Sequence, residues 1–200
     1  MIKQLAKFDR VSLLGVALLV IASPAFVGKA ISVGSVVPER KDDEEKRLLA
    51  IIRDKEAQES ARERCVQAIE RLGEIRSVTA VDDLIELITF KRTLRSEENP
   101  SPIVIDREHP VTPLSLYPAA GALFYIGKPA RPALLRLIET SDPDSLASQN
   151  AVYTLMAIFR EDPKAGIRYL QNAGNKAQTL EASKNLLRAV ERARNLFRIE

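Results

Sequence analysis

The sequence predicts an all-α fold, a short α-solenoid in which antiparallel helical hairpins stack side by side. Residues 122–138 contain two short apolar helical patterns separated by Gly127 and a proline-rich turn. Neither pattern is long enough to be stable alone. Residues 68–88 repeat the same design. Because each pattern has an apolar face that needs a partner, two such units indicate hairpins that pack against one another.

Residues 1–30 predict a targeting segment that precedes this fold. Three basic side chains come first, an apolar run over residues 11–27 follows, and Pro24 lies near its end beside small residues. A basic start, an apolar centre and small residues at the end are typical of a secretory signal peptide. Small residues at 23–25 and at 28–30 each offer a cleavage site, and we favour the second.

An uncleaved membrane anchor is the alternative for this segment. The apolar run over residues 11–27 reaches the lower end of the about 17–25 residues that span a bilayer. In either case, the basic residues before the run and the acidic residues 42–45 after it would leave the rest of the chain outside the cytoplasm. We therefore expect an exported protein, periplasmic or secreted. The alternative is a membrane-anchored protein that faces outside the cytoplasm and contacts the membrane only through residues 11–27.

The charge balance excludes one class of partner. Residues 1–30 hold four cationic side chains and one carboxylate, so they account for the whole formal net charge of +3. The remainder of the chain is neutral. Nucleic-acid binding needs an excess of Lys and Arg facing phosphate, and we therefore expect no nucleic-acid partner.

The first helices follow a flexible lead at residues 31–41, where small and β-branched residues show no period. A helix then begins at the acidic residues 42–45, because carboxylates in a first turn complement the helix dipole. The next helix begins at residues 59–60 and ends at Gly73. Cys65, the single cysteine, lies on its apolar side, which indicates a small buried hydrophobic residue. The helix that pairs with it carries apolar positions between Val81 and Ile88, with Thr79 as its N-cap.

Residues 94–118 interrupt the helical pattern as a Pro-rich insertion. Prolines at several positions forbid a helix there, and loops of this length are often functional. The only histidine, His109, lies in it near the carboxylates of Asp106 and Glu108. One His with two carboxylates and no second His makes a poor zinc site, so we interpret this segment as a solvated loop without a metal.

Helical hairpins resume after the insertion. Residues 119–126 pair with residues 132–139, and the proline in the first turn of the second pattern costs no hydrogen bond. Residues 142–145 form a turn and an N-cap, and a helix follows over residues 147–160.

Two further helices complete the chain. The first covers residues 164–172 and ends at Gly174, and the second covers residues 177–197. The positions expected to face inward on the last helix are Leu180, Leu187, Val190 and Phe197.

The hairpin pattern resembles a known repeat. The stretch Ala122-Leu-x-x-Ile-Gly-Lys-Pro-Ala-x-Pro-Ala-Leu-Leu-x-Leu-Ile138 is similar to a HEAT-type, armadillo-like repeat. In that family a first helix ends in Gly, an Asp/Lys-Pro-Ala turn follows, and the second helix carries a Leu-Leu-x-Leu-Ile run. Residues 68–88 match more loosely, with no proline in the turn, and residues 151–170 match more weakly again, with Glu161 in place of the glycine. The resemblance implies a HEAT-like repeat domain over residues 42–200.

The resemblance also implies where a partner would bind. HEAT-type proteins usually hold partners along the ridge formed by their second helices. The polar positions there would be Asp82, Asp83 and Glu86 in one unit, and Arg131 and Arg136 in another. Opposite signs on successive units would give a polarised surface.

Tyr125 is a further binding candidate. Most aromatic residues after Tyr117 lie on apolar faces and are expected in the core. Tyr125 instead adjoins Gly127 at a hairpin turn, where its phenol could reach solvent or a ligand.

Two classes of function fit this sequence. The first is an exported, non-catalytic protein-binding module or assembly scaffold, with a protein partner and with no catalytic residue, cofactor or metal. The second is an enzyme of helical fold that uses loop carboxylates and His109. General acid–base chemistry needs titratable groups that converge in a pocket, and one loop histidine supplies little of that. A membrane-tethered subunit of a larger complex differs from the first class only in whether the signal is cut.

Overall fold

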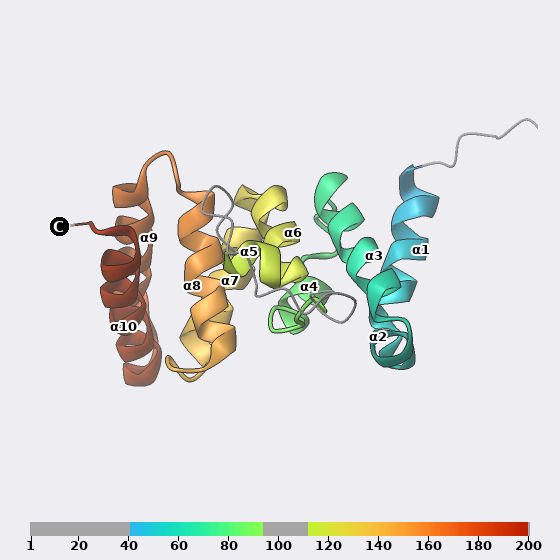
Figure 1. The fold of residues 1–200 in the computed structure, drawn as a ribbon. Coiled ribbons are helices and arrows are strands. Elements are labelled where there is room, and N and C mark those ends of the chain that lie inside the picture. The colour runs from blue at the N-terminus through green and yellow to red at the C-terminus, as the bar shows by residue number, and fades with distance from the viewer. Residues whose placement is uncertain (1–40, 94–111, 200) are drawn as a thin grey trace, which may run out of the picture. The chain divides into compact units, whose positions relative to one another are not determined.

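The computed structural model describes residues 41–93 and 112–199, and the regular structure in both ranges is entirely helical (Figure 1). The prediction of an all-α fold is confirmed for these residues. In chain order the helices are α1 (Lys41–Arg53), α2 (Lys55–Ser60), α3 (Arg62–Glu74), α4 (Val81–Glu86), α5 (Pro113–Leu116), α6 (Pro118–Ile126), the 3₁₀ helix η1 (Lys128–Ala130), α7 (Arg131–Thr140), α8 (Leu146–Ile158), α9 (Pro163–Lys176) and α10 (Leu180–Phe197).

Helix α1 begins as predicted, with three acidic residues in its first turn and Leu48, Leu49 and Ile52 buried. A short helix that the sequence analysis missed, α2, follows directly. The carboxylate of Asp54 caps it by accepting hydrogen bonds from the N–H groups of the second and third residues after it. The expected helix start at residues 59–60 was therefore wrong, because α3 begins only after the chain has turned at Ala61.

Gly73 does not end its helix, contrary to the prediction. It lies inside α3, and a Cβ atom at Gly73 would lie 2.7 Å from Ala122 Cα in α6. The glycine is required because the two helix backbones approach closely there. The helix ends at Glu74, and Arg76, two residues further on, has a left-handed φ of 54°. The N–H of Ser77 donates to the carbonyl of Leu72, as in a Schellman motif.

Helix α4 is short, and its expected N-cap is used elsewhere. Ala80 holds the N-cap position, and the N–H of Ala80 donates to the hydroxyl of Ser77. The hydroxyl of Thr79 instead donates to the carboxylate of Glu45 on α1. The prediction of Thr79 as N-cap was wrong because a charged acceptor from another helix competes for its hydroxyl.

The insertion is described only at its C-terminal end. Residues 94–111, which include His109, lie outside the described residues. Pro113 and Pro118 occupy the first positions of α5 and α6. The expectation that prolines exclude helix throughout this segment was therefore wrong at its end, since a proline at the first helical position has no N–H bond to lose.

The turn between α6 and α7 follows the prediction. Gly127 terminates α6 with a φ of 77° and a ψ of −129°, a conformation that side chains disfavour. The 3₁₀ helix η1 then leads into α7, where Pro132 lies in the first turn. Leu134 and Ile138 of α7 are fully buried.

Helices α8 and α9 begin within one residue of the predicted positions, whereas α10 begins at Leu180, three residues later than expected. The side chains of Ser145, Asp162 and Thr179 cap α8, α9 and α10. Helix α9 continues past Gly174 to Lys176, so the predicted helix end at Gly174 was wrong; Gly174 does not have the positive φ that a glycine at a helix end commonly adopts.

The inward face of α10 is rotated from the predicted one. Leu180 and Leu187 are 74% and 56% exposed, so these two predictions were wrong, whereas Val190 is buried as expected. The buried positions of α10 are Asn185, Leu186, Ala189, Val190 and Ala193. Two alanines in this set allow α10 to pack closely against its neighbours, an arrangement that side-chain size alone did not suggest.

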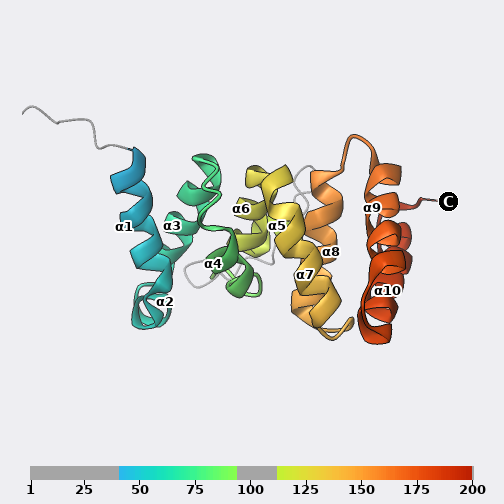
Figure 2. The same ribbon diagram turned by 180° about the vertical axis from the view of Figure 1, so that it is seen from behind.

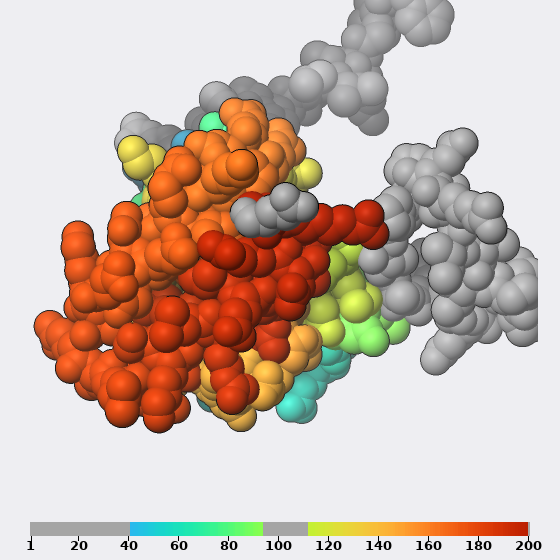
Figure 3. Space-filling model, turned by 90° about the vertical axis from the view of Figure 1, so that its left-hand side faces the viewer, coloured from blue at the N-terminus to red at the C-terminus, as the bar shows by residue number. Residues whose placement is uncertain are grey.

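Helix contacts define the order of packing in the unit formed by Pro38–Glu200. Helix α1 contacts α3, α3 contacts α6, and α6 contacts α8, an order that can be followed in Figures 1 and 2. Helix α4 contacts α7. Helix α7 in turn contacts α8 and α10. Helix α9 packs mainly on α10. Figure 3 views the surface that α9 and α10 form at this end.

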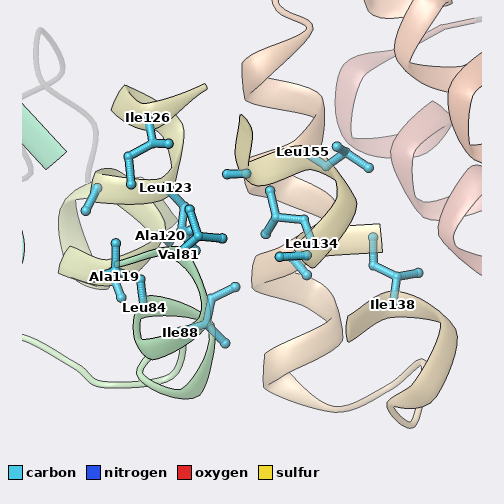
Figure 4. Close-up of a cluster of buried hydrophobic side chains, with 14 of the residues drawn as sticks. Val81, Leu84, Ile88, Ala119, Ala120, Leu123, Ile126, Leu134, Ile138 and Leu155 are labelled. Carbon is cyan, nitrogen blue, oxygen red and sulfur yellow. The ribbon is translucent and has the colours of Figure 1, made fainter. Parts of the chain in front are cut away.

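One continuous apolar cluster connects these helices, from Leu48 in α1 to Ala193 in α10. Figure 4 shows its central part, where α4, α6, α7 and α8 meet. Two amides link segments that are distant in the sequence, Asn150 of α8 to the turn after α4 and Asn185 of α10 to α7. The Asn150 amide donates to the Ile88 carbonyl at 2.9 Å, and the Asn185 amide donates to the Glu139 carbonyl at 3.0 Å. Among the described helices, none is long and apolar enough to cross a bilayer; residues 1–40 lie outside the described part.

Candidate functional site

Cationic side chains converge around an open hollow of about 470 Å³ beside the Gly127 turn. We call it the basic hollow. It is lined by four cationic side chains, one carboxylate and a tyrosine: Arg76, Lys128, Arg131, Arg160, Glu161 and Tyr125.

Three helix ends build the basic hollow. Arg76 follows the end of α3, Lys128 follows the end of α6, and Arg160 follows the end of α8. These three helices pack against one another in order, so their C-terminal ends bring one cation each to the same place. A cation at this position also interacts favourably with the negative end of the helix dipole.

Arg131 is the fourth cation and has a different origin. It is the first residue of α7, where the helix dipole disfavours a positive charge. Its guanidinium carbon lies 3.8 Å from the centre of the Phe159 ring. Its Nε is buried without a hydrogen-bond partner. Phe159 in turn packs against Tyr169, with ring centres 5.6 Å apart. Burial raises the pKa of the Tyr169 phenol, and the nearby Arg131 partly offsets this.

Tyr125 lies at the rim of the hollow and is 61% exposed. Its ring meets that of Phe124 edge to face, with centres 5.5 Å apart. The guanidinium of Arg160 lies over the Phe124 ring at 5.4 Å. The expectation that Tyr125 reaches solvent is confirmed, and its role in binding stays a prediction.

A second hollow, of about 450 Å³, adjoins the first and shares Phe124 and Tyr125 with it. We call it the neighbouring hollow. Its other lining residues include Glu70, Arg92 and Leu114. The carboxylate of Glu70 is paired with the guanidinium of Arg92. Together the two hollows extend across the C-terminal half of α6.

The other predicted binding residues lie apart from both hollows. Asp82 of α4 accepts a hydrogen bond from Arg136 of α7 at 3.0 Å. The carboxylate of Asp83 accepts two hydrogen bonds from the guanidinium of Arg53 in α1, from Nε at 2.8 Å and from Nη2 at 2.9 Å. Glu86, the last residue of α4, is exposed. Most of the opposite charges expected to polarise the ridge of second helices are therefore paired within the molecule.

Carboxylates of α1 are held by the end of α3 and the turn after it. The guanidinium of Arg71 donates to Glu44 at 2.7 Å and holds the pKa of that carboxyl below its usual value. The hydroxyls of Ser77 and Thr79 donate to Glu45 and lower its pKa in the same way.

No group of three or more His, Cys, Asp or Glu side chains that could hold a metal ion occurs within residues 41–93 and 112–199. Cys65 is fully buried, as predicted, and burial raises the pKa of its thiol. The proposed catalytic group of the enzyme alternative, His109, is not among the described residues. The chain matches no protein-family model, no curated protein and no solved structure.

Sequence reasoning found two residues of the basic hollow, Tyr125 and Arg131, and missed Arg76, Lys128 and Arg160. One signal could have found them. Each lies within two residues of an isoleucine that ends the first helical pattern of a unit. A basic residue at that point in three successive units indicates a cluster once the units are assumed to stack.

Proposed function

We propose that the protein is an exported, non-catalytic protein-binding module or assembly scaffold built on HEAT-like repeats. Packing of α3 on α6 and of α6 on α8, together with α4 on α7, supports the repeat arrangement. The resemblance of residues 122–138 to a HEAT-type repeat supports it independently. Export rests on the signal-peptide pattern of residues 1–30.

The observation that carries the binding proposal is the pair of adjoining hollows. They draw residues from the ends of three first helices that pack in order, and they share Phe124, which is partly buried, and Tyr125, which is exposed. Their openness and extent suit a segment of a protein partner, because aromatic and arginine side chains are the residues that most often carry binding energy at protein interfaces.

In-cell crosslinking tests this proposal. A photo-crosslinking phenylalanine analogue replaces Tyr125 at the rim of both hollows, or Leu180 as a control at the exposed start of α10. We expect illumination of the host cells to give a covalent adduct with a discrete protein partner at position 125 and a much weaker one at position 180. If exposed positions across the surface, such as Val78, Tyr125 and Leu187, gave no protein adduct, the binding function would be wrong.

Export is tested separately by the location and the N-terminus of the protein in its host. The proposal predicts a chain outside the cytoplasm that begins near residue 31. An intact N-terminus in the membrane fraction would favour the membrane-tethered alternative, and a soluble intact chain in the cytoplasm would contradict both.

A further inference from the structure

We infer that the basic hollow binds the carboxylates of an acidic peptide segment in the partner protein. The inference rests on the proposed binding function and specifies the chemistry of the partner. It begins from cations that have no anionic partner among the residues that the structure describes. Neither Arg76, Lys128, Arg131 nor Arg160 forms an ion pair with any described residue.

Elsewhere in the described ranges, arginines are commonly paired with carboxylates. Ion pairs with Asp or Glu are made by Arg53, Arg71, Arg92, Arg136, Arg168, Arg188 and Arg192. The basic hollow holds four cations and a single carboxylate, that of Glu161. The positive charge gathered there is therefore available to a ligand from outside.

Helix dipoles alone do not account for this cluster. They explain Arg76, Lys128 and Arg160, each of which follows the end of a helix. They do not explain Arg131, because the first turn of α7 disfavours a cation. The Nε–H of Arg131 is also buried without an acceptor, although a buried donor normally has one. An anion in the hollow would stabilise the positive charge of Arg131 and could accept a hydrogen bond from its Nε–H.

The guanidinium groups are positioned before any ligand arrives. Arg131 lies on the Phe159 ring at 3.8 Å, and Arg160 lies over the Phe124 ring at 5.4 Å. A guanidinium held on a ring keeps its planar edge of N–H donors free, and that edge matches a carboxylate in two parallel hydrogen bonds. Fixing the side chains in advance lowers the entropic cost of binding.

The neighbouring hollow favours a peptide over a small anion. It continues the surface past Phe124 and Tyr125 and adds apolar contacts from Leu114 and Pro118. Its two acidic residues, Glu70 and Glu74, are already paired with Arg92 and Arg71, so they would not repel an approaching segment strongly. A chain with carboxylates in the basic hollow and an adjacent apolar side chain in the neighbouring hollow fits both.

Fluorescence anisotropy on the full chain tests the inference. The probe is a fluorescein-labelled peptide of alternating Glu and Leu, and the matched control is the same peptide with Gln in place of Glu. We expect the acidic peptide alone to bind, and binding to weaken with added salt. Arg131→Gln and Arg160→Gln should each weaken it about tenfold, the effect of losing one charge-assisted contact. Glu161→Gln should tighten it, while Arg168→Gln and Arg136→Gln should leave it unchanged.

Three results would overturn the inference. One is equal binding of the acidic and the Gln peptides. Another is unchanged affinity in Arg160→Gln, which alters an exposed side chain and so leaves the fold intact. The third is displacement of the peptide by inorganic phosphate at concentrations comparable to those of the peptide itself, which would indicate a small-anion site.

The crosslinking experiment separates this inference from the proposed function. A protein adduct at position 125 without acidic-peptide binding would retain the scaffold and refute the carboxylate site. Peptide binding that depends on Arg131 and Arg160, with no protein adduct at any exposed position, would support the site's chemistry and refute the scaffold.

Discussion

Replacing Gly73 by alanine sets two physical effects of opposite sign against each other. In a helix interior, Gly→Ala stabilises by about 1 kcal/mol. At Gly73, however, the added Cβ would lie 2.7 Å from the Cα and 3.0 Å from the Cβ of Ala122 in α6. Backbone atoms cannot rotate away, so α3 and α6 must separate, and overpacking of this kind costs about 1–3 kcal/mol. The helix gain offsets part of this cost, so we expect Gly73→Ala to give no net stabilisation and to destabilise the fold by up to about 2 kcal/mol.

Gly174→Ala is the matched control for this prediction. Gly174 also lies within a helix, but its new Cβ would meet the Leu186 Cβ at 3.5 Å, an ordinary contact. The free energy of unfolding of this variant should exceed that of the wild type by about 0.4–1 kcal/mol. Urea unfolding followed by far-UV circular dichroism measures both variants. The close crossing of α3 and α6 would be refuted if Gly73→Ala gained as much stability as Gly174→Ala.

A double-mutant cycle distinguishes this clash from a helix stop. If Gly73 merely ended its helix, alanine there would also destabilise, but the loss would not depend on Ala122. Because the clash includes the Ala122 Cβ, Ala122→Gly should cost less in the Gly73→Ala background than in the wild type. Additive effects of the two substitutions would support the helix stop.

Arg76→Gly should stabilise the fold by about 0.5–1 kcal/mol in the same urea assay, because glycine adopts the left-handed conformation at this helix end without strain; a loss of stability would contradict that conformation. Glu45→Gln should make the free energy of unfolding fall less as the pH is lowered. Hydroxyl donors lower the folded-state pKa of Glu45 below its ordinary value of 4.5. The stabilisation by the Glu45 carboxylate is therefore present above pH 4.5 and is lost as the pH falls through the lowered pKa. Unfolding curves at a series of pH values measure this, and identical profiles for both proteins would refute it. The Cys65 thiol should react with a coloured disulfide reagent only after unfolding, because it is buried and its pKa is raised; rapid reaction of the folded protein would contradict its burial. Leu134→Asp should destabilise by several kcal/mol or prevent folding, since Leu134 is fully buried in the core; an unchanged unfolding curve would mean that this face of α7 is not in the core.

The sequence predicted local features of the fold well, because their causes lie within a few residues. Ser145 caps a helix through an N–H group three residues ahead, and Gly127 adopts a backbone conformation that only glycine tolerates easily. Gly73 shows where such reasoning fails. A glycine suits a helix end and a close helix crossing equally, and the choice depends on Ala122, which is distant in the sequence.

The difference between local causes and contacts distant in the sequence also applies to the last helix and to the candidate site. Leucines occur on both faces of α10, so the buried face is set by its contacts with α7 and α9. Tyr125 was found because it adjoins the Gly127 turn, and Arg131 because the HEAT-type resemblance places it on the ridge of second helices. The convergence of Arg76, Lys128 and Arg160 depends on the side-by-side packing of three helices, which no single stretch of sequence specifies.

A backbone-amide NMR titration with the Glu–Leu peptide tests the central claim most directly, because it maps binding on the whole described surface at once. The account predicts shifts concentrated at the basic hollow, at Arg76, Tyr125, Lys128, Arg131 and Arg160. Shifts concentrated instead along the outer faces of α4 and the middle of α7, where Asp82 pairs with Arg136, would place binding on the ridge of second helices and contradict it.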